Sequence, residues 1–240
     1  DNKILIGGFF TQYLNQSSYN DSLFRTTNDE NIRRFTYNKT LYQITQNGEL
    51  DLSFNASGIS AFSSDYSGVN DIQLQSNGKI LIGGGILYHN TTTNDTSFGI
   101  ARLNSNGSID NTFNISDGAL SVDVNGNIFP GVVHAIAPLS NGKIIVGGMF
   151  ETFSGVLKNG IARLNANGSI DNTFNSGNGL GYGGRIFDIE ILPNGKIIIA
   201  GVFSAYDGYN TSGIARLYAD GTIDNTFDVG SGFGLTGGYK

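Results

Sequence analysis

The sequence predicts an all-β fold built from about four copies of one module, for three reasons. Two short phrases recur in the same order along the chain, and glycine and asparagine mark the ends of the apolar runs. β-branched residues and phenylalanine dominate those runs, while few segments show the 3.6-residue apolar period of an amphipathic helix. The 240 residues are enough to bury a substantial core.

The first repeated phrase is Asn-Gly-Lys followed by an apolar run that ends in small residues. Its lysines are Lys79, Lys143 and Lys196, and a variant opens the chain at Lys3, so successive copies are 76, 64 and 53 residues apart. Asn-Gly is a strong hairpin signal because both residues accept a positive φ. We therefore expect a strand on each side of the phrase, for example 132–139 paired with 143–150.

The second repeated phrase is Ile-Ala-Arg-Leu, a polar turn with Asn-Gly or Asp-Gly, and then Ile-Asp-Asn-Thr-Phe. It predicts a second hairpin and hence a four-stranded antiparallel sheet in each module. The copies lie at 100–113, 161–174 and 214–227, with a degenerate copy at 41–54. The predicted modules run approximately over 1–68, 69–131, 132–184 and 185–240.

A four-stranded sheet of this size cannot bury both faces alone. Stacking such sheets radially as blades solves this problem, so the sequence predicts a β-propeller-like array. The glycine pair that ends each second strand fits close packing, because a bulky side chain would hold neighbouring sheets apart. The first module starts at its second strand, so its blade is incomplete. We expect a piece of a longer array, the alternative being a four-bladed unit with one incomplete blade.

These phrases resemble the delta-60 repeat, a β-propeller family. Its members carry Gly-Lys, an apolar run and Gly-Gly-x-Phe, followed by Ile-Ala-Arg-Leu-Asn and Asp-Gly-Ser-x-Asp-x-Thr-Phe. Residues 142–150 and 161–174 match most closely, whereas the first module has Gln43 in place of the arginine. The resemblance implies a repeat region within a large bacterial or phage surface protein and implies little about activity.

Charge and composition exclude several classes of partner. The net charge of −6 gives a surface that repels phosphate backbones, so we expect no nucleic-acid partner. No apolar run approaches the roughly 18 residues that a membrane helix needs, so we expect no membrane insertion. The absence of cysteine excludes disulfides and thiolate metal sites.

One arginine and one aspartate recur in phase, the aspartate eight positions after the arginine across a hairpin turn. They can form an ion pair or bond to backbone groups of the turn. Residues that recur in every module are best explained by the module, so we interpret them as structural. They are Arg102, Arg163, Arg216, Asp110, Asp171 and Asp224, with Asp51 in the first module.

The turn motif Asn-x-Asn-Gly-x-x-Asp resembles a calcium loop but supplies one acid per copy, so we interpret it as a turn. The two histidines stand apart. His134 is interpreted as a packed strand residue and His89 as an exposed residue of an insertion. Neither they nor the non-repeated acids form a recognisable catalytic constellation. We expect no catalytic residue, no metal and no cofactor.

Function is expected in the segments that do not recur, which are insertions at 14–37, 86–98 and 115–130. Aromatic and cationic side chains there suit a glycan or a protein partner. We predict an extracellular structural or recognition module of a phage tail or fibre, or of a bacterial surface adhesin. The alternatives are a glycan-active propeller enzyme and a passive spacer. The candidate binding residues are Phe24, Arg25, Arg33, Arg34, Phe35, Tyr37, Tyr88 and His89.

Overall fold

The computed structural model is all-β throughout the residues that it describes, as the sequence predicts. No helix that could cross a membrane occurs in these parts of the chain. The described residues are 3–8, 13–14, 33–34, 41–49, 51–61, 68–90, 95–228 and 230.

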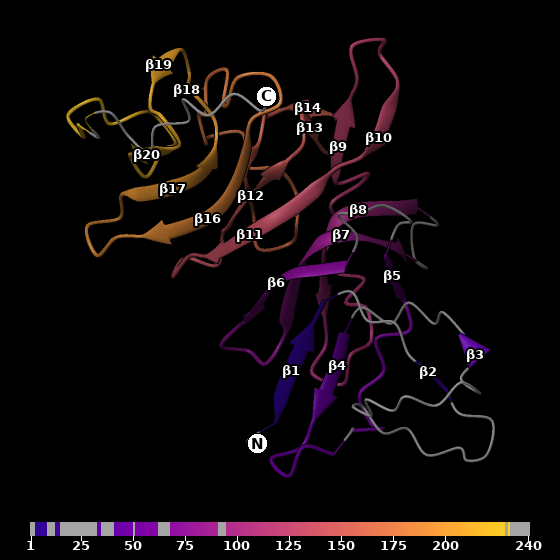
Figure 1. The fold of residues 1–240 in the computed structure, drawn as a ribbon. Helices are drawn as coiled ribbons and strands as arrows, with labels where there is room; N and C mark the ends of the chain where they lie inside the picture. Colours follow the sequence, from indigo (N-terminus) through magenta and orange to yellow (C-terminus); the bar gives the residue numbers. More distant parts are fainter. Residues whose placement is uncertain are drawn as a thin grey trace.

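Three blades each contain three long antiparallel strands, and the first module contributes the two strands β1 and β4. Figure 1 shows these sheets following one another along the array, from β1 and β4 near the N-terminus to β16, β17 and β20. The propeller-like array of antiparallel blades is therefore confirmed. The strands are β1 (Ile4–Gly7) and β4 (Leu41–Ile44), then β6 (Gly68–Leu74), β7 (Ile80–Asn90) and β8 (Asp95–Leu103), then β11 (Val132–Pro138), β12 (Ile144–Met149) and β15 (Ile161–Leu164), and finally β16 (Arg185–Ile191), β17 (Ile197–Val202) and β20 (Ile214–Leu217).

The expected hairpin across Asn141-Gly142 is present, with Pro138 paired to Ile144 and Val132 to Met149. The fourth strand of each complete blade is shorter than expected. It is reduced to a single bridge, which in the third module joins Leu164 and Ile170. The cause is local, because Asp171 accepts a hydrogen bond from the backbone N–H of Thr173 and bends the chain directly after the bridge.

The glycine pair at the end of β12 packs as closely as the sequence indicates. A Cβ atom at Gly147 would lie 2.7 Å from Cγ2 of Ile186 in the next blade. A Cβ atom at Gly148 would lie 2.0 Å from the carbonyl oxygen of Val132 in its own blade. The first glycine thus lets two blades approach, and the second leaves room for the β-bulge between Val133 and Ala135.

Shorter strands extend the sheets. β5 pairs with the end of β7, and β9 pairs with both β10 and β13, so the third insertion is a hairpin that joins the next module. These short strands are β2 (Tyr13–Leu14), β3 (Arg33–Arg34), β5 (Ile59–Ala61), β9 (Ala119–Val122), β10 (Ile128–Pro130), β13 (Thr152–Phe153), β14 (Val156–Leu157), β18 (Ala205–Tyr206) and β19 (Tyr209–Asn210).

The core is apolar and continuous within two groups of blades.

The two ends of the blades differ in kind. Because the strands are antiparallel, the tight Asn-Gly or Asp-Gly turns all lie at one end, which we name the turn end. The connections from second to third strand, and from each blade to the next, lie at the other end, which we name the loop end. All three insertions belong to connections of the loop end.

Candidate functional site

The repeated charges meet at the turn end. In the second module, Asp110 Oδ2 accepts from Arg102 Nε at 2.6 Å and from Lys79 Nζ at 2.7 Å. Its Oδ1 accepts from the backbone N–H and the hydroxyl of Thr112. The same arrangement recurs at Asp171, with Lys143 and Arg163, and at Asp224, with Lys196 and Arg216. The lysine of the first phrase is thus a third partner that spacing alone had not assigned.

These contacts lower the pKa of the aspartates. Burial alone would raise the pKa of Asp110, but hydrogen bonds from Lys79, Thr112 and Arg102 outweigh it and hold the pKa well below the ordinary value. At Asp224 the hydrogen bond from Lys196 is the largest cause of the lowering. Each carboxylate therefore stays charged and fully engaged, which suits a structural tie.

The arginines also tie one blade to the next. Arg102 Nη1 donates to the carbonyl oxygen of Ala166 at 2.6 Å, and Arg163 Nη1 donates to that of Ala219 at 2.5 Å. Each guanidinium also lies over a phenylalanine of its own module, at 4.7 Å from the centroid of Phe113 in the case of Arg102. The arginine therefore bonds to both groups foreseen from the sequence, a carboxylate and a turn backbone.

The first module keeps part of this arrangement despite Gln43. Lys3 Nζ lies 2.8 Å from Asp51 Oδ2, and this hydrogen bond, with those from Ser53, lowers the pKa of Asp51 to about 2. A backbone bond from Asn55 N to Asn106 O joins this module to the next one. Equivalent bonds join Asn114 to Asn167 and Asn175 to Asp220, so every successive pair of modules is linked at the turn end.

The candidate binding residues of the first insertion fall mostly outside the described residues. This holds for Phe24, Arg25, Phe35 and Tyr37. The backbone of Arg33 and Arg34 forms β3, which pairs with β2. Binding by this insertion remains a prediction.

The second insertion requires a correction. Residues 86–90 and 95–98 continue the hairpin of β7 and β8 and do not form a separate loop. Tyr88 is only 2% exposed, lies in the core and donates its hydroxyl to the carbonyl oxygen of Phe113. It cannot contact a partner while the blade is folded, whereas His89, the next residue along the strand, is exposed.

His134 lies on β11, the first strand of its blade, at the β-bulge. Its ring lies 5.1 Å from that of Phe187 on β16, and its Nδ1 lies 3.1 Å from Asn70 Nδ2 on β6. Burial, and then the charge of Arg185, lower its pKa. His134 is therefore a packed strand residue, as interpreted from the sequence, and it contacts the bulge residues 70 and 187 of the two neighbouring blades.

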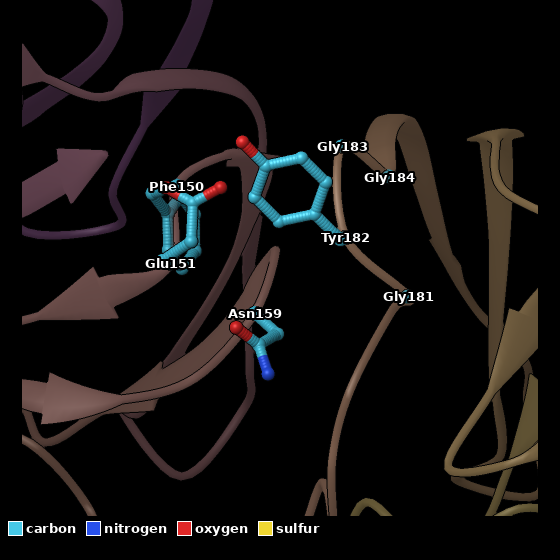
Figure 2. A pocket seen from close by; sticks show the side chains of 7 residues that line it. All are labelled: Phe150, Glu151, Asn159, Gly181, Tyr182, Gly183 and Gly184. Atoms are coloured by element: carbon cyan, nitrogen blue, oxygen red, sulfur yellow. The ribbon is translucent and has the colours of Figure 1, made fainter. Parts of the chain in front are cut away.

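A small pocket opens at the loop end of the third module, beside the segment that leads to the fourth (Figure 2). Its volume is about 190 Å³. The connection between β12 and β13 supplies Phe150 and Glu151, and Asn159 follows β14. The segment before β16 supplies Tyr182 and its neighbouring glycines. Sequence reasoning missed this pocket, because its two walls come from segments of the third module that lie far apart along the chain.

The loop end also exposes apolar side chains on the hairpin of β9 and β10. They are Val124, Ile128 and Phe129, of which Val124 is 82% exposed. Within the described ranges, no three His, Asp or Glu side chains gather as a metal site.

Three segments of the chain, 75–113, 139–174 and 192–227, match a family model described as a domain of unknown function (DUF5122) beta-propeller. Each match runs from the Asn-Gly-Lys turn to the phenylalanine under the arginine, and so contains the lysine, arginine and aspartate of one module. No match was found among curated protein sequences.

Two solved structures show a distant likeness. One is PorZ of Porphyromonas gingivalis, described as an essential bacterial surface component of the type-IX secretion system, with 15% identity and a TM-score of 0.42. That match covers 80% of this chain and 24% of PorZ, so the chain spans about a quarter of the length of that protein. The other is a protein of unknown function from Bacteroides caccae, with 15% identity, a TM-score of 0.27 and coverage of 77% of this chain and 73% of that one.

The antiparallel blades and the three matched segments together identify the chain as a β-propeller repeat protein.

Proposed function

We propose that the chain is a non-enzymatic recognition module of delta-60 type on an extracellular surface. It belongs to a bacterial surface adhesin or to a phage tail or fibre, and its loop end binds a glycan or a protein. One observation carries the proposal, namely that the repeated lysine, arginine and aspartate lie at the turn end, whereas the three insertions belong to connections of the loop end.

At the turn end, the repeated charged residues hold the modules together. The lysine, arginine and aspartate of each complete module are bound to one another, and two of the arginines also reach the next blade. Groups engaged in this way are not free to bind a ligand. A polar network of this kind stabilises only when its members are all satisfied, which favours its recurrence in every module.

The loop end also carries bonds between modules, such as Ser154 N to Gly118 O and Asp207 N to Gly179 O, but its connections differ in length from one module to another. It carries the three insertions, the exposed apolar hairpin of β9 and β10, and the pocket beside Tyr182. A rigid scaffold that presents variable connections on one face is the usual arrangement of binding proteins built from repeats.

The proposal is tested by replacing residues 15–36 with a short glycine-serine linker and measuring binding to a glycan array and to bacterial cells. Changing the length of a connection between two strands changes the loop-closure entropy only a little, so the variant should fold. We expect binding to fall strongly. The matched control is Leu74→Ser, because Leu74 is 70% exposed at the turn end, and its loss should leave binding unchanged.

Two results would overturn the proposal. Equal binding by the linker variant and the unaltered chain, with no loss from other loop-end changes, would favour a passive spacer. Release of reducing ends from a polysaccharide, abolished by one acid substitution, would establish the glycan-active enzyme instead.

A further inference from the structure

The loop-end pocket of the third module combines a flat aromatic ring with hydrogen-bond acceptors. Tyr182 is 75% exposed, and in Figure 2 the carboxylate of Glu151 is directed toward its ring, with the side chain of Asn159 nearby. Phe150, which is almost fully buried, forms the floor. Three structural elements thus converge on one small cavity.

The polar groups of the pocket are held in place and yet keep free acceptors. Glu151 Oε2 accepts from the backbone N–H of Val122 at 2.8 Å, and Oε1 has no partner among the described residues. Asn159 Nδ2 donates to the carbonyl oxygen of Asn178 at 2.8 Å, which leaves its Oδ1 free within the same part of the chain. The backbone of Asn159 has a positive φ of 39°, and Ser212 at the equivalent position of the fourth module has 47°, so this conformation belongs to the repeated turn.

Two of the glycines beside Tyr182 face open space. A Cβ atom at Gly181 or Gly183 would meet nothing within 4 Å, so these positions border empty space. A ligand ring can therefore lie against the tyrosine and reach the backbone of this segment.

We propose that this pocket binds one ring of a glycan that carries no acidic group. A sugar ring has a C–H face that packs on an aromatic ring and several hydroxyl donors that suit Glu151 Oε1 and Asn159 Oδ1. The lining contains one carboxylate and no lysine or arginine, so a uronic acid or a sulfated sugar meets like charge. The inference deepens the proposed function, on which it rests, by naming a site and a ligand class.

The probe is an array of neutral oligosaccharides, based on hexoses and N-acetylhexosamines, with uronic-acid and sialic-acid oligosaccharides beside them. The neutral glycan that binds best is then titrated by calorimetry into the unaltered chain, Tyr182→Ala, Glu151→Gln and Tyr209→Ala. The last is the matched control, since Tyr209 is an exposed tyrosine of the loop end outside the pocket. Thermal melting of each variant checks that it is folded.

We expect neutral glycans to bind, with affinity reduced about tenfold in Tyr182→Ala and Glu151→Gln and unchanged in Tyr209→Ala. The inference would be overturned if the chain bound only acidic glycans or no glycan at all. It would also be overturned if Tyr182→Ala bound neutral glycans as strongly as the unaltered chain does. The proposed function fails separately. It stands if the chain still binds cells through residues 15–36 while the pocket variants change nothing, and it falls with the inference if neither cells nor glycans are bound.

Discussion

Nη1 of Arg163 donates to the carbonyl oxygen of Ala219, 56 residues later and in the next blade, at 2.5 Å. Through its Nε the same guanidinium bonds to Asp171 of its own module. One side chain therefore links the hairpin inside a blade to the turn of its neighbour. The stability of the array depends on this link as well as on apolar packing between sheets.

The inter-blade bond predicts unequal effects of equivalent substitutions. Arg163→Met and Arg216→Met both remove an aspartate bond and a contact with a phenylalanine, but Arg216 makes no bond to a further blade among the described residues. We expect Arg163→Met to lower the free energy of unfolding by about 1.5 kcal/mol more, the contribution of a charged donor. Urea denaturation of both variants measures the difference, and equal losses would refute the link.

The aspartates predict a loss of stability in acid. The pKa values of Asp110, Asp171 and Asp224 are lower in the folded chain than the ordinary 3.8, so the unfolded chain binds protons first as the pH falls. Their contribution is complete well above pH 3.8 and is lost as the pH falls through that value toward the folded pKa. Urea midpoints measured between pH 6 and pH 3 should decline. In Asp171→Asn the decline should be shallower, and an unchanged slope would contradict the assignment.

The glycine that accommodates the bulge predicts a steric penalty. Gly148→Ala places a Cβ atom against the carbonyl oxygen of Val132, a backbone atom that cannot move freely. We expect the free energy of unfolding to fall by about 3 kcal/mol. Gly181→Ala is the control, since its Cβ atom would meet nothing within 4 Å. Thermal or urea unfolding compares the two, and similar stabilities would show that the bulge is not constrained there.

His134 predicts a titration that depends on Arg185. Burial, and then the Arg185 charge, lower the pKa of the histidine below its ordinary 6.5. NMR titration should give a midpoint below 6.5, with the resonance identified by its loss in His134→Gln. Arg185→Met should raise that midpoint. Since the folded pKa is the lower one, stability falls as the pH drops below 6.5. A midpoint at or above 6.5 would exclude the buried environment.

Much of the fold could be predicted because local signals and packing agree in this chain. Asn141-Gly142 fixed the hairpin of β11 and β12, and the pair Gly147-Gly148 correctly indicated where neighbouring backbones approach. The fourth strand was predicted too long. The phrase Ile-Asp-Asn-Thr-Phe has strand propensity, but the carboxylate of Asp171 takes the N–H of Thr173 and ends the ladder.

The sites were harder to predict than the fold. Lys143 occupies the same place in its module as Lys79 and Lys196, and this recurrence was the signal that would have joined the lysine to the arginine and aspartate. Tyr88 was misplaced because a strand that extends beyond its repeated length looks like an insertion in sequence. The pocket had no signal, since Glu151 and Tyr182 lie 31 positions apart, and the tertiary fold of the third module, with a bond from Leu180 N to Asn159 O, brings their segments together.

The central claim is that the turn end holds the array together while the loop end recognises its ligand. One experiment tests it directly, in which melting temperature and affinity for the best neutral glycan are measured on Arg163→Met and Tyr182→Ala side by side. We predict that Arg163→Met melts at a lower temperature but, below that temperature, binds as the unaltered chain does, and that Tyr182→Ala keeps its melting temperature and loses about tenfold in affinity. Loss of glycan affinity in the folded Arg163→Met variant, with none in Tyr182→Ala, would contradict the claim.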